Sequence, residues 1–345
     1  MFDRKKDAQN HLAEVEGSKL TGTYIDPKAG RTTFRTYAEQ WRVIQPHRPS
    51  TESKYKRVLE LHVYPRLGGR RMAQIRPSHI QALVTECGQM MAPNTVRGIH
   101  RVVSAVFAAA LADRLIVVSP CTKRVVVPKA PRAEIEPFTV EQVAKLFDAM
   151  PERYRALAVV GAGLGLRFSE AVGLTVDRVD FLRRTVTVDR QLLPGAGPVR
   201  FGPPKTASSA RKVPAPQVVL DELARHLATY PASAEGLIFT NSRGRSVKAN
   251  SISDQWLASA ARAGLPEGSR YHELRHFYAS LLIDQGASVK SVQRNLGHSS
   301  AMVTLNLYSH LWPDSDDRTR AAVDNVLGGV VAPALHGHQL QGVEA

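Results

Sequence analysis

The chain has 345 residues, more than one compact core of ordinary size needs, and this length predicts two domains. Hydrophobic residues make up 43% of it, but no run approaches the roughly 20 apolar residues of a membrane helix. The charged start from Met1 to Lys6 precedes no apolar segment and does not match a secretion signal. Because Cys87 and Cys121 belong to no motif, we expect reduced thiols in a cytoplasmic protein.

Positive charge is concentrated in the first half of the chain. The formal net charge is +15 and the isoelectric point is about 10.1. Residues 31–132 alone contain 18 Lys and Arg but 5 Asp and Glu, more than solubility requires. Nucleic acid is favoured over a membrane as the partner because no basic amphipathic or lipidated segment accompanies the charge. A basic surface without a partner is the alternative.

Residues 1–30 form a separate N-terminal segment. A helical pattern runs from Asp7 to Leu20 and is followed by the helix breakers Gly22, Pro27 and Gly30. A lone helix of this kind cannot bury an apolar face by itself.

Residues 31–120 predict an all-helical, basic domain. Phe34, Tyr37, Ala38, Trp41 and Ile44 recur at the three-to-four spacing of a helix that buries one face. Three more helices are expected. They run from Ser50 to an end at Pro65 and the Gly68-Gly69 turn, from Pro77, and from Asn94 with Val96, Ile99, Val103, Val106 and Phe107 inward. Four cations on these helices could contact DNA, namely Lys54, Arg57, Arg97 and Arg101. Each could equally be a solvated charge.

Prolines mark residues 121–137 as a linker, and a second domain is expected over 138–327, with a tail at 328–345. Thr139 looks like a helix cap, and 155–164 reads as an apolar helix. Thr185–Val188 and Arg211–Pro214 predict short strands, and the chain from Ser251 is helical again. The expected fold class is mostly α, with an α+β second domain that contains a small β-sheet.

Five short motifs follow one another in the second domain, and each alone is weak. They are Gly163–Glu170, Pro204–Thr206, His272–His276, Leu296–Ser300 and Thr304–His310.

Taken together, these motifs supply the groups that phosphodiester chemistry needs. Arg167 and Arg275 are guanidiniums that each can bind two oxygens, which suits a phosphate gaining charge. Tyr308 offers a nucleophilic hydroxyl, and Lys205 could protonate the 5′ oxygen that leaves. His272 shares a helix face with Arg275 and could accept the phenolic proton or bond a non-bridging oxygen. His298 reaches the same phosphate if the chain turns near residue 299.

This ordered set resembles the signature of the tyrosine recombinase (phage integrase) family, and the resemblance covers nearly the whole chain. It implies a helical core-binding domain ahead of a catalytic domain. It also implies that Tyr308 attacks a phosphate activated by Arg167, Lys205, His272, Arg275 and His298. Glu170 matches an acidic residue that steadies the first arginine, and His276 matches a common second histidine. The neighbouring Lys212 is the alternative to Lys205.

The resemblance implies a site-specific DNA recombinase, an integrase that works through a 3′-phosphotyrosine and integrates or excises a phage or mobile element. Neither a metal nor ATP nor any other cofactor is expected. The expected partners are double-stranded DNA crossover sites, three further copies in a homotetramer on DNA, and a DNA-bending or directionality factor. Residues 1–30 resemble the end of a module that binds arm-type DNA sites.

Two other interpretations remain open from the sequence. His272-Glu273-x-x-His276 fits the helix pattern of zinc proteases, with His298 or His310 as a third ligand, but this leaves the basic domain and Arg167 unexplained. A DNA-binding protein of recombinase ancestry without catalysis is the second, and the intact set of six residues argues against it. Glu170 could also be a surface acid of a helix, and His276 a packed helper.

Overall fold

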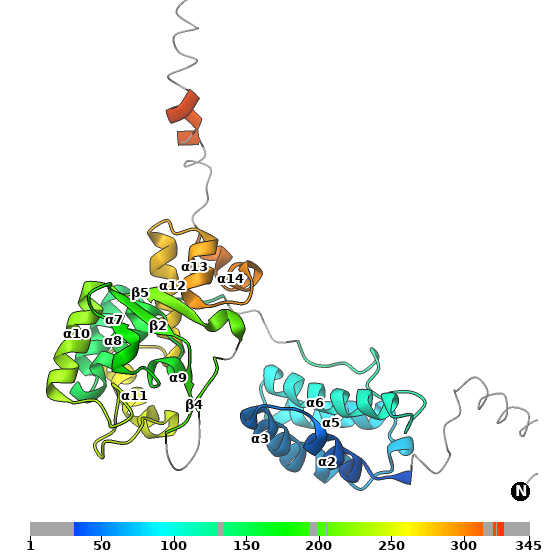
Figure 1. The fold of residues 1–345 in the computed structure, drawn as a ribbon. Coiled ribbons are helices and arrows are strands. Elements are labelled where there is room, and N and C mark those ends of the chain that lie inside the picture. Colours follow the sequence, from blue (N-terminus) through cyan, green and yellow to red (C-terminus); the bar gives the residue numbers. More distant parts are fainter. Residues whose placement is uncertain are drawn as a thin grey trace, which may run out of the picture. The chain divides into compact units, whose positions relative to one another are not determined.

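The structure is a computed structural model, and the chain divides into two compact units, residues 1–132 and 133–345 (Figure 1). The residues that it describes are 31–129, 134–193, 199–204, 206–312, 320–321 and 323–327. The N-terminal segment 1–30, Lys205 and the tail 328–345 lie outside the described residues.

The described part of the first unit is helical, as the sequence predicts. Its helices are α2 (Phe34–Ile44), α3 (Pro49–Val58), a π-helical turn (Leu59–Val63), α4 (Tyr64–Leu67), a 3₁₀ turn (Met72–Gln74), α5 (Pro77–Met90) and α6 (Pro93–Ala112). In α2, Phe34, Tyr37 and Trp41 are buried as expected. Ile44 is 77% exposed, because it is the last residue of α2 and the chain turns away at Gln45.

The predicted helix end at the Gly68-Gly69 turn is confirmed, but Pro65 does not end the helix. The helix continues through the π-helical turn into α4 and ends at Leu67, next to Gly68. Pro65 is the second residue of α4, at the junction where the hydrogen-bond pattern changes from π-helical to α-helical, so its missing backbone N–H is tolerated.

Helix α6 is the central helix of the first unit. Its inward positions are all buried, namely Val96, Ile99, Val103, Val106 and Phe107. By length and composition this helix could cross a membrane. However, it packs against α2, α5 and the π-helical turn, so its apolar face belongs to a protein core.

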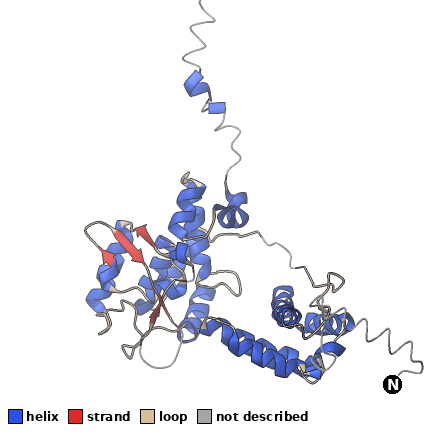
Figure 2. Cartoon of the chain, turned by 45° about the vertical axis from the view of Figure 1, so that its right-hand side comes forward, coloured by secondary structure: helices blue, strands red, loops and turns tan. Residues whose placement is uncertain are grey.

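The second unit combines helices with two small sheets (Figure 2). Its helices are α7 (Val140–Ala149), α8 (Glu152–Leu164), α9 (Phe168–Ala171), α10 (Gln217–Thr229), α11 (Ala249–Arg262), α12 (His272–Asp284), α13 (Val289–Leu296) and α14 (Ala301–Tyr308). Its strands are β1 (Val179–Asp180), β2 (Thr185–Val188), β3 (Gln191–Leu192), β4 (Phe201–Gly202) and β5 (Arg211–Pro214). Its 3₁₀ turns are Val176–Arg178, Ala207–Ser209 and Ser309–Leu311. The mostly α fold class is confirmed.

The larger sheet is antiparallel with the strand order β1-β2-β5, and β3 pairs with β4 in a separate ribbon. Both predicted strands exist and pair directly, with Val186 opposite Val213. The other three strands are two residues long, too short for an alternating pattern to reveal them.

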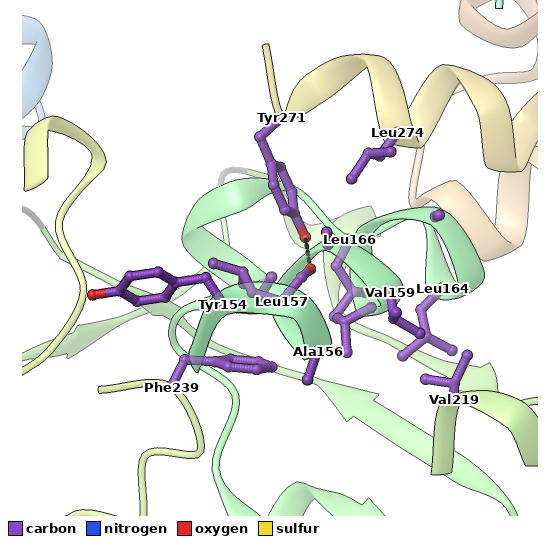
Figure 3. Packing of buried hydrophobic residues seen from close by; sticks show 14 of the residues in the cluster. Tyr154, Ala156, Leu157, Val159, Leu164, Leu166, Val219, Phe239, Tyr271 and Leu274 are labelled. Carbon is purple, nitrogen blue, oxygen red and sulfur yellow. Dashed lines mark hydrogen bonds between the residues drawn. The ribbon is translucent and has the colours of Figure 1, made fainter. Parts of the chain in front are cut away.

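Helix α8 lies at the centre of the core, which is why it is apolar on almost every side. Figure 3 shows Leu157 and Leu164 on this helix, with Val219 from α10 and Leu274 from α12 packed nearby. The hydroxyl of Tyr271 donates to the carbonyl of Leu157 at 3.3 Å, so the residue before α12 is tied to α8. The core thereby fixes the start of α12, which carries the His272–His276 motif.

Gly165 ends α8 in a left-handed conformation, with φ of +62°. A Cβ atom there would lie 2.4 Å from Cδ1 of Tyr278, so only glycine fits. The turn carries the chain directly to Arg167.

We expect Gly165→Ala to destabilise the second unit by roughly 3 kcal/mol, since it combines left-handed strain with overlap against Tyr278. Gly264→Ala is the matched control, because Gly264 has φ of +69° but nothing within 4 Å of a Cβ atom. The control should cost only about 1 kcal/mol. Urea unfolding of both variants checks this, and equal losses would show that the close approach to Tyr278 does not matter.

Candidate active site

The predicted site residues come together in the second unit. Arg167 precedes α9, His272, Arg275 and His276 lie on α12, His298 follows α13, and Tyr308 ends α14. Helices α12, α13 and α14 pack on one another, and β5 packs on α13. Lys205 belongs to the connection between β4 and β5 but lies outside the described residues.

The two predicted arginines are held by carbonyl groups at helix ends. Arg275 is 1% exposed, and its guanidinium donates to the carbonyl of Gly165 at 2.7 Å and to that of Leu296. Arg167 donates to the carbonyl of Gly297 at 3.4 Å. Gly165 and Gly297 are the left-handed caps of α8 and α13, where carbonyls lack partners within the helix and carry partial negative charge. The two helix ends therefore aim both guanidiniums into one site.

Glu170 is buried and bonded to Arg167, so it is not a surface acid. Its carboxylate accepts from Arg167 Nη1 at 2.7 Å and from the Arg167 backbone N–H at 3.1 Å. Burial alone would raise the pKa of the Glu170 carboxyl, but the charges of Arg211 and Arg167 lower it below its ordinary value. Glu170 is therefore an anion at neutral pH.

All three histidines of the site have a pKa below the ordinary value of histidine. Burial, with the charge of Arg275, lowers the pKa of His298 to about 3, and its Nδ1 shares a 2.9 Å hydrogen bond with the hydroxyl of Thr304. Burial, with His272 and Arg275, lowers the pKa of His276 to about 4. Partial desolvation and then Arg275 also lower the pKa of His272, although this ring is exposed to solvent.

Tyr308 is enclosed by these histidines and is 1% exposed. Its hydroxyl shares a 2.7 Å hydrogen bond with Nδ1 of His276, and its ring stacks on that of His298 with centroids 6.4 Å apart. Burial raises the pKa of Tyr308 to about 12 even though Arg275 opposes the rise. The hydroxyl is thus a neutral phenol that already contacts a proton acceptor.

Arg211, which the sequence analysis assigned only to a strand, is part of this site. Its side chain is 4% exposed, and its Nη2 donates to Glu170 at 3.0 Å. In β5, Arg211 shares a face with the buried Val213. A cation on the inward face of a strand is the signal that could have revealed it.

The cations proposed as DNA contacts lie on neighbouring helices of the first unit. Lys54 and Arg57 are exposed on α3, and Arg97 and Arg101 are exposed on α6. Each pair is spaced by one helical turn, so its members share a helix face. Helices α3 and α6 contact each other.

The zinc-protease interpretation finds no support in the geometry. Within the ranges that the structure describes, no group of three or more His, Cys, Asp or Glu side chains could hold a metal ion. The rings that would serve as ligands have other partners, since His276 bonds Tyr308, His298 bonds Thr304, and His310 donates to the carbonyl of Ile135.

Comparison with known proteins places the chain in one family. Residues 136–314 match the model of the phage integrase family, and residues 34–124 match that of the phage integrase central domain. The chain is 28% identical to a XerC-like tyrosine recombinase of Caldanaerobacter subterraneus subsp. tengcongensis, over 90% of this chain and 86% of that protein. It is 26% identical to the integrase of Mycobacterium phage L5, over 88% of this chain and 84% of that protein.

Solved structures show the same fold. The Tn1549 transposon integrase in complex with a circular intermediate DNA is 23% identical, with a TM-score of 0.74, and the match covers 85% of this chain and 99% of that chain. The lambda integrase in a tetramer bound to a Holliday junction is 15% identical, with a TM-score of 0.62, over 87% and 89% of the two chains.

The chain belongs to the phage integrase family, the tyrosine recombinases. It is a site-specific recombinase, so the enzyme class expected from the ordered motifs is confirmed.

The buried His298 should make the second unit less stable in acid. When the pH falls from about 7.5 to about 5, the imidazole takes up a proton in the unfolded chain but stays neutral in the folded one. Protonation then favours unfolding and costs about 2 kcal/mol by pH 5. His298→Gln should lose this share of the pH dependence in urea unfolding measured across that range. The same slope in both proteins would contradict a buried neutral His298.

Proposed function

We propose that this recombinase cuts and rejoins DNA with Tyr308 as its nucleophile. The observation that carries the proposal is the buried Tyr308 hydroxyl, which is hydrogen-bonded to His276 beside the guanidinium of Arg275. A phenol placed between a proton acceptor and fixed cations has what it needs to attack an anionic phosphodiester.

The phosphate binds to Arg167, Arg275 and His298 in this proposal. The guanidiniums bond its non-bridging oxygens, which gain negative charge as the tyrosine oxygen adds in line. Both arginines are already fixed by backbone carbonyls, so little reorganisation is needed when the charge develops. His272, which lies beside His276 with ring centroids 4.9 Å apart, bonds a phosphate oxygen at the exposed edge of the site.

The proton movements follow from the same contacts. The Tyr308 proton passes along its existing hydrogen bond to His276, so that a bond forms between Tyr308 Oη and phosphorus while the bond to O5′ breaks. Phosphate binding brings an anion that favours a charged histidine, which makes His276 a better acceptor than it is in the free protein. Lys205 gives a proton to the leaving O5′, and attack by a 5′ hydroxyl of the partner duplex reverses the steps and joins the strands.

The partners are proposed from the relatives and from the charge. Double-stranded DNA suits the basic first unit, whose exposed cations Lys54, Arg57, Arg97 and Arg101 would contact its phosphates. Relatives described as phage and transposon integrases support action on a mobile element, and the lambda integrase tetramer supports assembly of four copies. The site of action would be the cytoplasm, and a DNA-bending or directionality factor would set the direction of the reaction.

Tyr308→Phe should abolish covalent protein–DNA adducts while folding and DNA binding persist. The change removes one oxygen and one hydrogen bond, which costs about 1 kcal/mol of stability. Denaturing gel electrophoresis after incubation with a nicked crossover-site substrate measures the adduct.

Tyr278→Phe is the matched control, because Tyr278 is a buried tyrosine of the same apolar cluster and should still form adducts. An adduct with Tyr308→Phe would show that another residue is the nucleophile. DNA binding without any adduct from the unaltered protein would support the non-catalytic alternative.

Lys205→Ala should slow cleavage of ordinary DNA about 100-fold or more but recover on DNA with a 5′-bridging sulfur, which leaves without a proton. Lys212→Ala is the control, since Lys212 is exposed on the opposite face of β5 from Arg211. Equal slowing of Lys205→Ala on both substrates would refute its role, and selective recovery of Lys212→Ala would transfer that role to Lys212.

A further inference from the structure

One group in the site has no part in the steps above. The side chain of Arg211 is almost completely buried, and all three nitrogen atoms of its guanidinium donate to other groups of the second unit. Its Nε donates to the carbonyl of Asn295 at 2.6 Å, Nη1 to that of Ser209 at 2.9 Å, and Nη2 to Glu170 at 3.0 Å. These acceptors lie on α13, on the turn before β5, and on α9.

The three segments are the ones that carry the proposed chemistry. Glu170 holds Arg167, Asn295 is three residues before His298, and Ser209 closes the connection in which Lys205 lies. The chain is tightly packed here, because a Cβ atom at Gly297 would lie 3.1 Å from Arg211 Nη1 and 3.1 Å from Ser209 Cα. One planar guanidinium therefore sets the spacing among three parts of the site.

We propose that Arg211 is a positioning residue for recombination, because its hydrogen bonds hold Glu170, and through it Arg167, in place beside the segment that carries His298. The inference rests on the proposed role of these residues at the phosphate. Arg211 contacts neither the DNA nor the reacting atoms.

The charge of Glu170 depends on Arg211 more than on any other neighbour. Burial disfavours the carboxylate, and Arg211 is the largest influence that restores it, ahead of Arg167. The other titratable groups close enough to feel the charge of Glu170 are Tyr271, His272 and Arg275. Without Arg211, burial would raise the pKa of Glu170, and at lower pH Arg167 would face a neutral carboxyl group.

The first test compares Arg211→Met with the double variant Glu170→Gln/Arg211→Met. The rate of adduct formation is measured at saturating nicked DNA from about pH 6 to about pH 8.5, and each rate is divided by that of the unaltered protein. At about pH 6 the rate of Arg211→Met should be about 100-fold lower than that of the unaltered protein. At about pH 8.5 the rate should partly recover, because Glu170 then ionises. The double variant should stay slow at every pH, because glutamine does not titrate.

Arg211→Lys separates charge from geometry. A lysine keeps the positive charge beside Glu170 but cannot reach three acceptors with one planar group. We expect its rate of adduct formation to be about 10-fold lower than that of the unaltered protein, with the same dependence on pH. Arg178→Met is the control, because Arg178 pairs with Asp189 at 2.9 Å elsewhere in the unit and should keep the normal rate.

The outcomes separate this proposal from that for Tyr308. A normal rate for Arg211→Met, or a loss with the same pH profile as the double variant, would overturn the positioning role.

If Arg211→Met does not fold, the profile of Arg211→Lys and the rate of Glu170→Gln decide instead, and normal rates in both would overturn it. If the unaltered protein forms no adduct, the Tyr308 proposal fails. In that case infrared spectroscopy still tests the role of Arg211. A protonated Glu170 gives a carboxyl band that is absent in Glu170→Gln, and Arg211→Lys should lack this band if Glu170 stays charged.

Discussion

The active site depends on holding several positive charges close together where they are largely buried. Arg167, Arg211 and Arg275 converge there, and in the part of the chain that the structure describes Glu170 is the one carboxylate paired with them. The remaining compensation comes from carbonyls at the ends of α8 and α13. Burial, together with repulsion among the three arginines, lowers the pKa of Arg275 to about 9. Burial and the charge of Arg275 keep His276 and His298 neutral. In the proposed mechanism, a phosphodiester anion completes this balance of charge.

The fold brings the ends of α8 and α13 and the start of α12 together at the active site. Left-handed glycines stop α8 and α13 so that their last carbonyls face the arginines. Burial of α8 on nearly all sides fixes these carbonyls, and the bond from Tyr271 to Leu157 fixes the start of α12. The charged site is thereby built against the buried core of the second unit, which holds its groups close to one another.

Much of this could be predicted from the sequence. The helix cap at Thr139, the strands β2 and β5, the inward face of α6 and that of α2 apart from Ile44 follow from local patterns and are confirmed. The motif order also pointed to Arg167, Arg275 and Tyr308 as one set. Local patterns fail where tertiary contacts decide, as in the helix that continues past Pro65 and in the two-residue strands.

The same limit applies within the site. The spacing of His272 and His276 on α12 is visible in the sequence, but which of them contacts Tyr308 depends on how α14 packs on that helix. The structure gives the contact to His276. Arg211 was missed because its partners lie 41 and 84 positions away, at Glu170 and Asn295, and no local pattern records such distances.

The most direct test of this account is to find the bond between protein and DNA. Adducts trapped on a nicked crossover substrate can be digested with protease and nuclease, and the modified peptide identified by mass spectrometry. The account predicts a nucleotide joined through its 3′ phosphate to Tyr308, in the peptide that ends α14. Attachment to another residue, or through a 5′ phosphate, would contradict it.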